Sequence, residues 1–139
     1  MGEIMNRSEV RELAFKLLYQ IEIQKEISKE DIALYYENNN ITSKQAQEYI
    51  EDVIEGVSSK SEKIIEIISK NLKEDWKIER VSKINLALLK LGIYEILYKK
   101  IPFKVVINEV VELAKKYGEE TSHSFINGIL ASVIKGEEN

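Results

Sequence analysis

The sequence predicts an all-α protein, and three observations support that fold class. Apolar residues recur at intervals of three and four along most of the chain, which is the spacing of one buried helix face. The 139 residues include a single proline and six glycines, so few positions interrupt a helix. Alternation of apolar and polar residues, which is typical of a half-buried strand, is rare. A chain of this length forms one domain, or two very small bundles that share a core.

Composition and charge exclude several classes of protein. The absence of cysteine and the single histidine exclude disulfide scaffolds, cysteine zinc sites and multi-histidine metal sites. No apolar run approaches the roughly 20 residues that span a bilayer, so we expect no membrane partner. The net charge of −4 argues against binding of nucleic acid through an overall positive charge of the protein. Residues 98–118 nevertheless carry five lysines against two glutamates, so a local basic patch remains open.

Helix-start signals divide the chain into seven predicted helices joined by short connections, which together form an all-α bundle. Pro102 separates the fifth helix from the sixth, and Gly92 lies inside the fifth, where glycine costs about 1 kcal/mol relative to alanine. That cost suggests a close approach of another helix. The predicted starts are Asn6 with Glu9, Ser28 with Asp31, Thr42 with Gln45 and Ser59 with Glu62, followed by helices over about 82–98, about 105–117 before Gly118, and from Thr121 or Ser122 onward.

The first predicted helix carries more than one apolar face. Phe15, Tyr19 and Ile23 lie to the side of its main apolar stripe, so this helix is either sandwiched within its own fold or faces a partner. Arg7 and Arg11 lie one turn apart near its start. Two such arginines can contact successive phosphates, or they can form surface ion pairs with neighbouring glutamates.

The stretch from residue 101 to residue 130 concentrates groups that suit single-stranded RNA, which is held by cations on phosphates and by rings stacked on unpaired bases. The alternative interpretation is a solvated helix face with aromatic residues in the core, and Tyr117 does fall on the core side of its helix. The basic, hydroxyl and aromatic side chains in question are those of Lys104, Lys115, Lys116, Tyr117, Ser122, His123 and Phe125.

Patterns of catalytic chemistry are missing. The chain contains neither of the usual glycine-rich phosphate loops. A catalytic triad would have to use His123, which lies at a predicted helix start without a nucleophile turn. The carboxylates lie on polar helix faces. The sequence therefore predicts a binding protein that needs no cofactor and no metal, rather than an enzyme.

Four segments of the chain resemble motifs of the NusB family of transcription antitermination factors. They are RELAFKLLY at 11–19, LKLGIYEI at 89–96, PFKVVINEVVELAKKYG at 102–118 and SHSFINGIL at 122–130. The last two are the most specific, and the resemblance covers essentially the whole chain. It implies a single NusB-like RNA-binding domain over residues 1–139, built from about seven helices in two small packed bundles.

The same resemblance implies a function. NusB-like proteins are not enzymes. They bind the single-stranded boxA element of nascent RNA jointly with NusE, which is also a small-subunit ribosomal protein. The complex joins an antitermination assembly on RNA polymerase that supports ribosomal RNA transcription, which places the protein in the cytoplasm.

Site residues follow from the resemblance position by position. Tyr19 and Asn85 lie on the side that faces NusE. Ser8, Glu9 and Val10 separate the two arginines where the family often has a denser arginine cluster, which implies weaker RNA binding without NusE. Lys16 replaces a frequent glutamine and restores some positive charge, whereas Thr121 and Asn85 stand where acidic residues are usual. The RNA-contacting residues that the resemblance implies are Arg7, Arg11, Lys104, Tyr117, Ser122, His123 and Phe125.

Two alternatives stay open at this point. One is a helical adaptor that binds only protein and has lost its RNA surface. The other is a fragment of a ribosomal RNA cytosine methyltransferase, because some of these enzymes carry a NusB-like domain before the catalytic domain. No methyl-donor-binding domain follows Ile134 in this sequence, which argues against the second.

Overall fold

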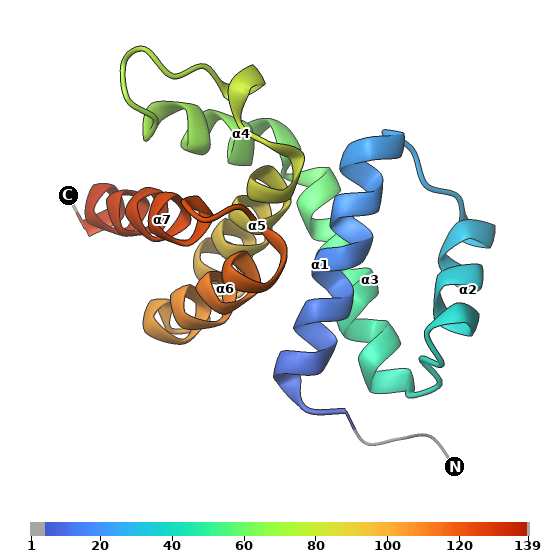
Figure 1. Ribbon diagram of the computed structural model, residues 1–139. Helices are drawn as coiled ribbons and strands as arrows, with labels where there is room; N and C mark the ends of the chain where they lie inside the picture. Colours follow the sequence, from blue (N-terminus) through green and yellow to red (C-terminus); the bar gives the residue numbers. More distant parts are fainter. Residues whose placement is uncertain (1–4, 139) are drawn as a thin grey trace.

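The computed structural model describes residues 5 to 138, and all regular secondary structure in this range is helical, as the sequence predicts (Figure 1). No helix in this range is both long enough and apolar enough to cross a membrane. The elements are α1 (Arg7–Gln24), α2 (Lys29–Asn38), α3 (Lys44–Ser59), α4 (Ser61–Lys70), the short 3₁₀ helix η1 (Ile78–Arg80), α5 (Lys83–Ile93), the π-helical turn η2 (Tyr94–Tyr98), α6 (Phe103–Tyr117) and α7 (Ser122–Glu138).

Two groups of helices share one core. Figure 1 shows α1, α2 and α3 on one side of the molecule and α4, α6 and α7 on the other, with α5 between them. Helix α1 packs against both α3 and α5, and α5 also packs against α6 and α7. The buried apolar side chains form one continuous cluster. Helix α2 contributes no buried residue to it. This helix is held from outside, where the Tyr35 hydroxyl donates a 2.7 Å hydrogen bond to the carbonyl of Leu13.

The first two predicted helix starts are confirmed in detail. Asn6 accepts a hydrogen bond from the backbone N–H of Glu9, whose side chain accepts one from the backbone of Asn6. Ser28 and Asp31 make the same reciprocal pair at the start of α2. Such capping boxes satisfy N–H groups that have no partner within the helix.

The next two starts are corrected by one residue each. Ser43 rather than Thr42 caps α3, because its hydroxyl accepts the N–H of Ala46. Ser59 is the last residue of α3, and Lys60 alone separates it from α4 without any side-chain cap. A change of direction between two packed helices therefore occurs at one residue, which the local sequence signals do not reveal.

Close packing explains two glycines. A Cβ atom on Gly92 would lie 3.0 Å from Cδ1 of Leu130 on α7, so the predicted close approach of another helix is confirmed. Gly118 ends α6 with φ of −90°, which any residue adopts. The reason for glycine there is space, because a Cβ would lie 2.8 Å from the carbonyl oxygen of Ala114.

The fifth and sixth predicted helices differ from the structure at their ends. The fifth remains α-helical only to Ile93 and then widens into the π turn η2. The sixth begins at Phe103, two residues earlier than predicted, because Pro102 stands in the cap position just before the first turn. Single π turns of this kind are frequent at functional sites.

Candidate nucleic-acid interface

Side-chain hydrogen bonds join α1 to α6 along one seam. The Ser8 hydroxyl donates to the carboxylate of Glu109. Further along both helices, the Lys116 ammonium lies 2.6 Å from Oε2 of Glu12, and the Tyr117 hydroxyl donates to the same oxygen. The N-terminal half of α1 therefore lies beside the middle and the end of α6.

The seam changes the acid–base properties of Glu12. Partial burial acts to raise the pKa of this carboxyl, but the hydrogen bonds from Lys116 and Tyr117 outweigh it, so the pKa lies below its ordinary value. The same contact with Glu12 raises the pKa of Lys116. Glu12 therefore stays ionised and keeps the Lys116 ammonium in place.

Arg11 lies inside the molecule, with 2% of its surface exposed. Its Nε is 2.7 Å from Oε1 of Glu95 in η2, its Nη2 is 3.2 Å from Oε2 of the same carboxylate, and its Nη1 is 3.0 Å from Oε1 of Glu109. The Tyr49 hydroxyl donates a 2.9 Å bond to Oε2 of Glu95. One guanidinium thus connects α1, α3, η2 and α6.

The electrostatics of this cluster favour the ionised pair. Burial acts to lower the pKa of Arg11, but hydrogen bonding and attraction to Glu95 raise it overall. Burial also raises the pKa of the Tyr49 hydroxyl, and the nearby Glu95 carboxylate adds to that shift. Arg11 and Glu95 therefore both stay charged, and their ion pair is part of the folded structure.

Two of the residues predicted to contact RNA are buried in the structure. The Arg11 guanidinium lies inside the molecule, where it binds Glu95 and Glu109. Ser122 is also buried, and its hydroxyl accepts a 2.9 Å hydrogen bond from the backbone N–H of Glu119 at the turn before α7. Both side chains are therefore buried, and their hydrogen bonds stabilise the local structure.

Tyr117 is half-buried, and its ring has several neighbours. The Phe15 ring lies 5.3 Å away between centroids. The ammonium groups of Lys16 and Lys116 lie over the ring at 5.5 Å and 5.4 Å from its centroid. The ring therefore positions two cations from different helices.

The other predicted RNA residues lie at or near the surface of α1, α6 and α7. Arg7 in the first turn of α1 and Lys104 in the first turn of α6 are exposed, and Phe125 is half-buried against the core. His123 lines a shallow groove of about 430 Å³ between α6 and α7, together with Lys115. The structure thus groups Tyr117, Lys16 and Lys116 at the α1–α6 seam. His123 lies on the α7 side of α6 and Lys104 in the first turn of α6, while Arg7 is exposed in the first turn of α1.

The two predicted partner-facing residues lie on α1 and α5, which pack together. Tyr19 is half-buried and stacks on Phe15 with 6.5 Å between ring centroids. Ile23, one turn further, is 51% exposed. The second apolar side of α1 is therefore sandwiched at one end and open at the other. The buried Oδ1 atom of Asn85 has no hydrogen-bond partner within residues 5–138.

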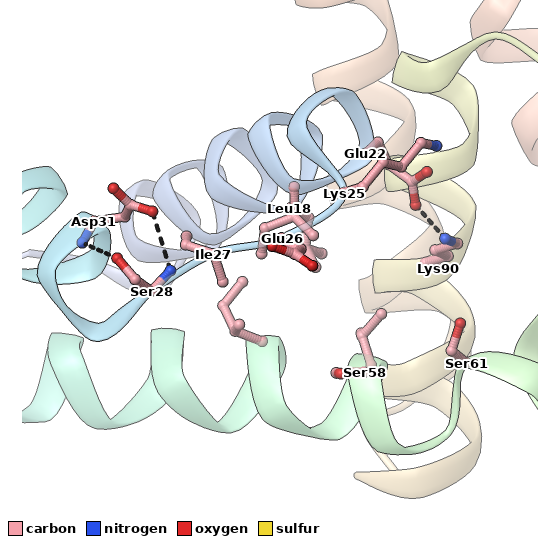
Figure 2. Close-up of a pocket in the computed structure, with 13 residues that line it drawn as sticks. Leu18, Glu22, Lys25, Glu26, Ile27, Ser28, Asp31, Ser58, Ser61 and Lys90 are labelled. Carbon is pink, nitrogen blue, oxygen red and sulfur yellow. Dashed lines mark hydrogen bonds and ion pairs between the residues drawn. The ribbon is translucent and has the colours of Figure 1, made fainter.

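A larger hollow of about 780 Å³ lies between the end of α1, the start of α2, the end of α3 and α5 (Figure 2). Its floor is apolar, with Leu18 and Ile54 buried, and its rim mixes acidic and basic side chains. Figure 2 shows Lys90 paired with Glu22 at one edge of the hollow. This mixture of charges does not match a phosphate chain.

Sequence reasoning missed the two acids that hold Arg11. Glu95 stands within the otherwise apolar run from Leu91 to Leu97, and a single acid in such a run is a signal of a buried partner. Glu109 gives no such signal, because it occupies an ordinary polar position in its helix. Only the packing of α6 against α1 reveals its contacts.

Comparison with known proteins supports the resemblance of the motifs. The profile of the NusB family matches residues 8–135. The transcription antitermination protein NusB of Ruminiclostridium cellulolyticum is 49% identical over 134 residues, which cover 96% of this chain and 91% of the relative. The protein of the same name from Clostridium acetobutylicum is 45% identical over 135 residues, with 96% and 98% covered.

Solved structures agree with the fold. The T. maritima NusB structure superposes with a TM-score of 0.83 at 33% identity, covering 97% of this chain and 93% of that one. A crystal structure of antitermination factors NusB and NusE in complex with dsRNA matches with a TM-score of 0.84 at 30% identity, covering 94% and 96%.

Proposed function

Because this chain belongs to the NusB family of transcription antitermination proteins, we propose that it binds the single-stranded boxA element of nascent RNA together with NusE. The complex acts in the cytoplasm within the antitermination assembly on RNA polymerase and supports ribosomal RNA transcription. The whole chain serves as one RNA-binding domain. It is a binding protein, as the other members of the family are, and not an enzyme.

The observation that carries this proposal is the seam between α1 and α6. Bonds from Ser8 to Glu109 and from Lys116 to Glu12 hold the two helices together. Exposed cations flank those bonds, with Arg7 next to Ser8 and Lys116 at the other end. The groove at the seam also contains Glu12, Glu109 and Glu112, so the exposed lysines on these rigid helices, rather than the groove as a whole, are the groups that suit a phosphate backbone.

Each proposed contact has a defined role. Arg7 and Lys104 bind phosphates, since both are exposed and positively charged. His123 and Phe125 face the strand from the start of α7, where polar groups and rings bind unpaired bases. Arg11, Ser122 and Tyr117 act indirectly, because they hold the helices that carry the contacting side chains.

In this proposal NusE binds further along α1, toward its C-terminal end. Tyr19 and Ile23 offer an apolar surface there, and α5 supplies Asn85 beside it. The buried Oδ1 of Asn85 lacks a hydrogen-bond donor within the described chain, and such an acceptor is costly unless a partner satisfies it. The related solved complex contains NusE and RNA together, which supports simultaneous binding.

Titration of labelled boxA RNA with this protein, with and without NusE, across a range of salt concentrations tests the proposal. We expect binding that strengthens with NusE and weakens as salt rises, because phosphate contacts release counterions. An unrelated single strand and a duplex of the same sequence serve as competitors, the duplex because the related solved complex contains dsRNA. Binding that ignores sequence, or no binding with NusE present, favours the protein-only adaptor.

A further inference from the structure

Two lysines from different helices converge on one aromatic ring. Lys16 comes from the middle of α1, and Lys116 comes from the last turn of α6. Their ammonium groups lie 5.5 Å and 5.4 Å from the centroid of the Tyr117 ring. A cation over an aromatic face is attracted by the ring quadrupole, so this geometry restricts two otherwise flexible side chains to one small area.

We infer that Lys16 and Lys116 form a pair that binds phosphate groups of the RNA backbone, with both ammonium groups positioned over the Tyr117 ring. This inference rests on the proposed RNA-binding function and adds two contacts to it. Both side chains are exposed on their helices, so a strand that passes over the seam can reach them.

The local charge balance favours an anion at this position. The Glu12 carboxylate lies near both ammonium groups, and of the two it accepts a hydrogen bond only from Lys116. Its side chain is 24% exposed, whereas that of Lys116 is 61% exposed. Glu12 is therefore partly buried beneath two exposed ammonium groups. Glu109 and Glu112 also line this groove, where they pair with Arg11 and Lys115, so the outward side of the lysine pair remains positive.

Preorganisation is the second reason. A free lysine loses rotamer entropy when it binds a phosphate. At this seam, the Tyr117 hydroxyl and the Lys116 ammonium share one oxygen of Glu12, which ties the ring and one cation into a single unit. The Phe15 ring packs against Tyr117 from the core and limits its movement. Part of the ordering cost is therefore met before RNA binds.

The pair also extends the proposed RNA surface along α1. Arg7 lies at the first turn of this helix, and Lys16 lies nine residues later, which is about 13 Å of helix rise. Ser8 and Glu12 lie between them and contact α6. Nine residues also rotate the helix by about 180°, so Arg7 and Lys16 project from different sides of α1, and the lysine pair is a contact separate from that of Arg7.

The test uses the full chain with NusE and labelled boxA RNA, comparing wild type with Lys16→Gln, Lys116→Gln and the double variant. Glutamine keeps most of the side-chain stem and removes the charge. Each lost phosphate contact should reduce the slope of log K against log salt by roughly 0.7 and weaken binding about fivefold at 0.1 M salt, with the difference vanishing near 1 M. Lys44→Gln, at an exposed position on α3, is the matched control and should leave the slope unchanged.

The outcomes separate this inference from the proposed function. If wild type binds with a clear salt dependence and both variants retain its slope, the lysine pair is not a phosphate site and the inference is wrong. If wild type does not bind RNA even with NusE, the proposed function itself fails and the inference fails with it. A fall in melting temperature without any change of slope would show that the two lysines only stabilise the seam.

Discussion

Glu95 accepts two hydrogen bonds from the Arg11 guanidinium, one on each carboxylate oxygen, and both side chains are buried. This pair joins the first helix to the π turn that ends α5. Because of this pair, Arg11 is a structural residue although it lies near the start of its helix. It also explains why the acid in the apolar run of residues 91–97 is tolerated, since a buried charge needs a charged, hydrogen-bonded partner.

Replacing Arg11 by alanine should destabilise the fold by about 3–5 kcal/mol, because it leaves the Glu95 carboxylate buried without its partner. Urea unfolding followed by circular dichroism measures this change. Arg7→Ala provides the comparison within the same helix, since Arg7 is exposed, and it should change stability by less than about 0.5 kcal/mol. Equal stability of the two variants would contradict the structural role of Arg11.

Arg7→Ala and Lys104→Ala should each weaken boxA RNA binding while helicity stays unchanged. Each removes an exposed cation at a proposed phosphate contact, so the salt slope should fall by roughly 0.7 per variant. Fluorescence anisotropy across salt concentrations, with far-ultraviolet circular dichroism as the folding control, gives both values. Unchanged affinity in both variants would mean that the strand follows a different surface.

Two glycines should respond to alanine in opposite directions. A Cβ on Gly56 would collide with the Tyr94 ring, which is buried and donates a 3.0 Å hydrogen bond to Asp52. Gly56→Ala should therefore destabilise the protein by about 1–3 kcal/mol through overpacking. Gly128 on α7 has open space around its Cβ position, so Gly128→Ala should stabilise the helix by about 0.5–1 kcal/mol. Thermal unfolding of the pair checks both signs.

Glu12 should contribute to the acid sensitivity of the fold. Its folded-state pKa is lowered by hydrogen bonds from Lys116 and Tyr117 that outweigh burial. A lowered pKa means that the stabilisation is complete above the unfolded value of about 4.3 and is lost as pH falls through the folded value. The stability difference between wild type and Glu12→Gln should therefore shrink as pH decreases below about 4.3.

Melting curves of both proteins from pH 7 to pH 2 measure that convergence. Glu48→Gln, at an exposed position on α3, is the control for the general effect of removing a carboxylate. A constant difference between wild type and Glu12→Gln at every pH would show that the seam does not depend on the ionisation of Glu12.

Leu17→Ala should cost about 2–5 kcal/mol, because Leu17 is fully buried and its truncation leaves a cavity. The same helix offers a control in Ile23, which is half exposed and should lose far less on truncation. Chemical denaturation of both variants distinguishes the core stripe of α1 from its open apolar end. Similar losses at the two positions would mean that the stripe is assigned wrongly.

The helical fold class, most of the helix starts and the family could be predicted from the amino-acid sequence. These features are local or periodic. A side-chain oxygen at Asn6 or Ser28 caps the helix that follows it, and the repeat of apolar residues reports which face is buried. Gly92 also announced a close helix contact, because glycine in a helix interior is costly without one.

Packing between distant segments sets which charged and aromatic side chains remain at the surface. Arg7 and Arg11 lie one turn apart and look alike in the sequence, yet Arg7 is exposed and Arg11 is buried. The difference arises because Glu95 and Glu109, distant in sequence, are carried to Arg11 by the packing of α5 and α6 against α1. A contact between residues some 80 to 100 positions apart leaves no local pattern in the sequence, so it is seen only in the folded structure.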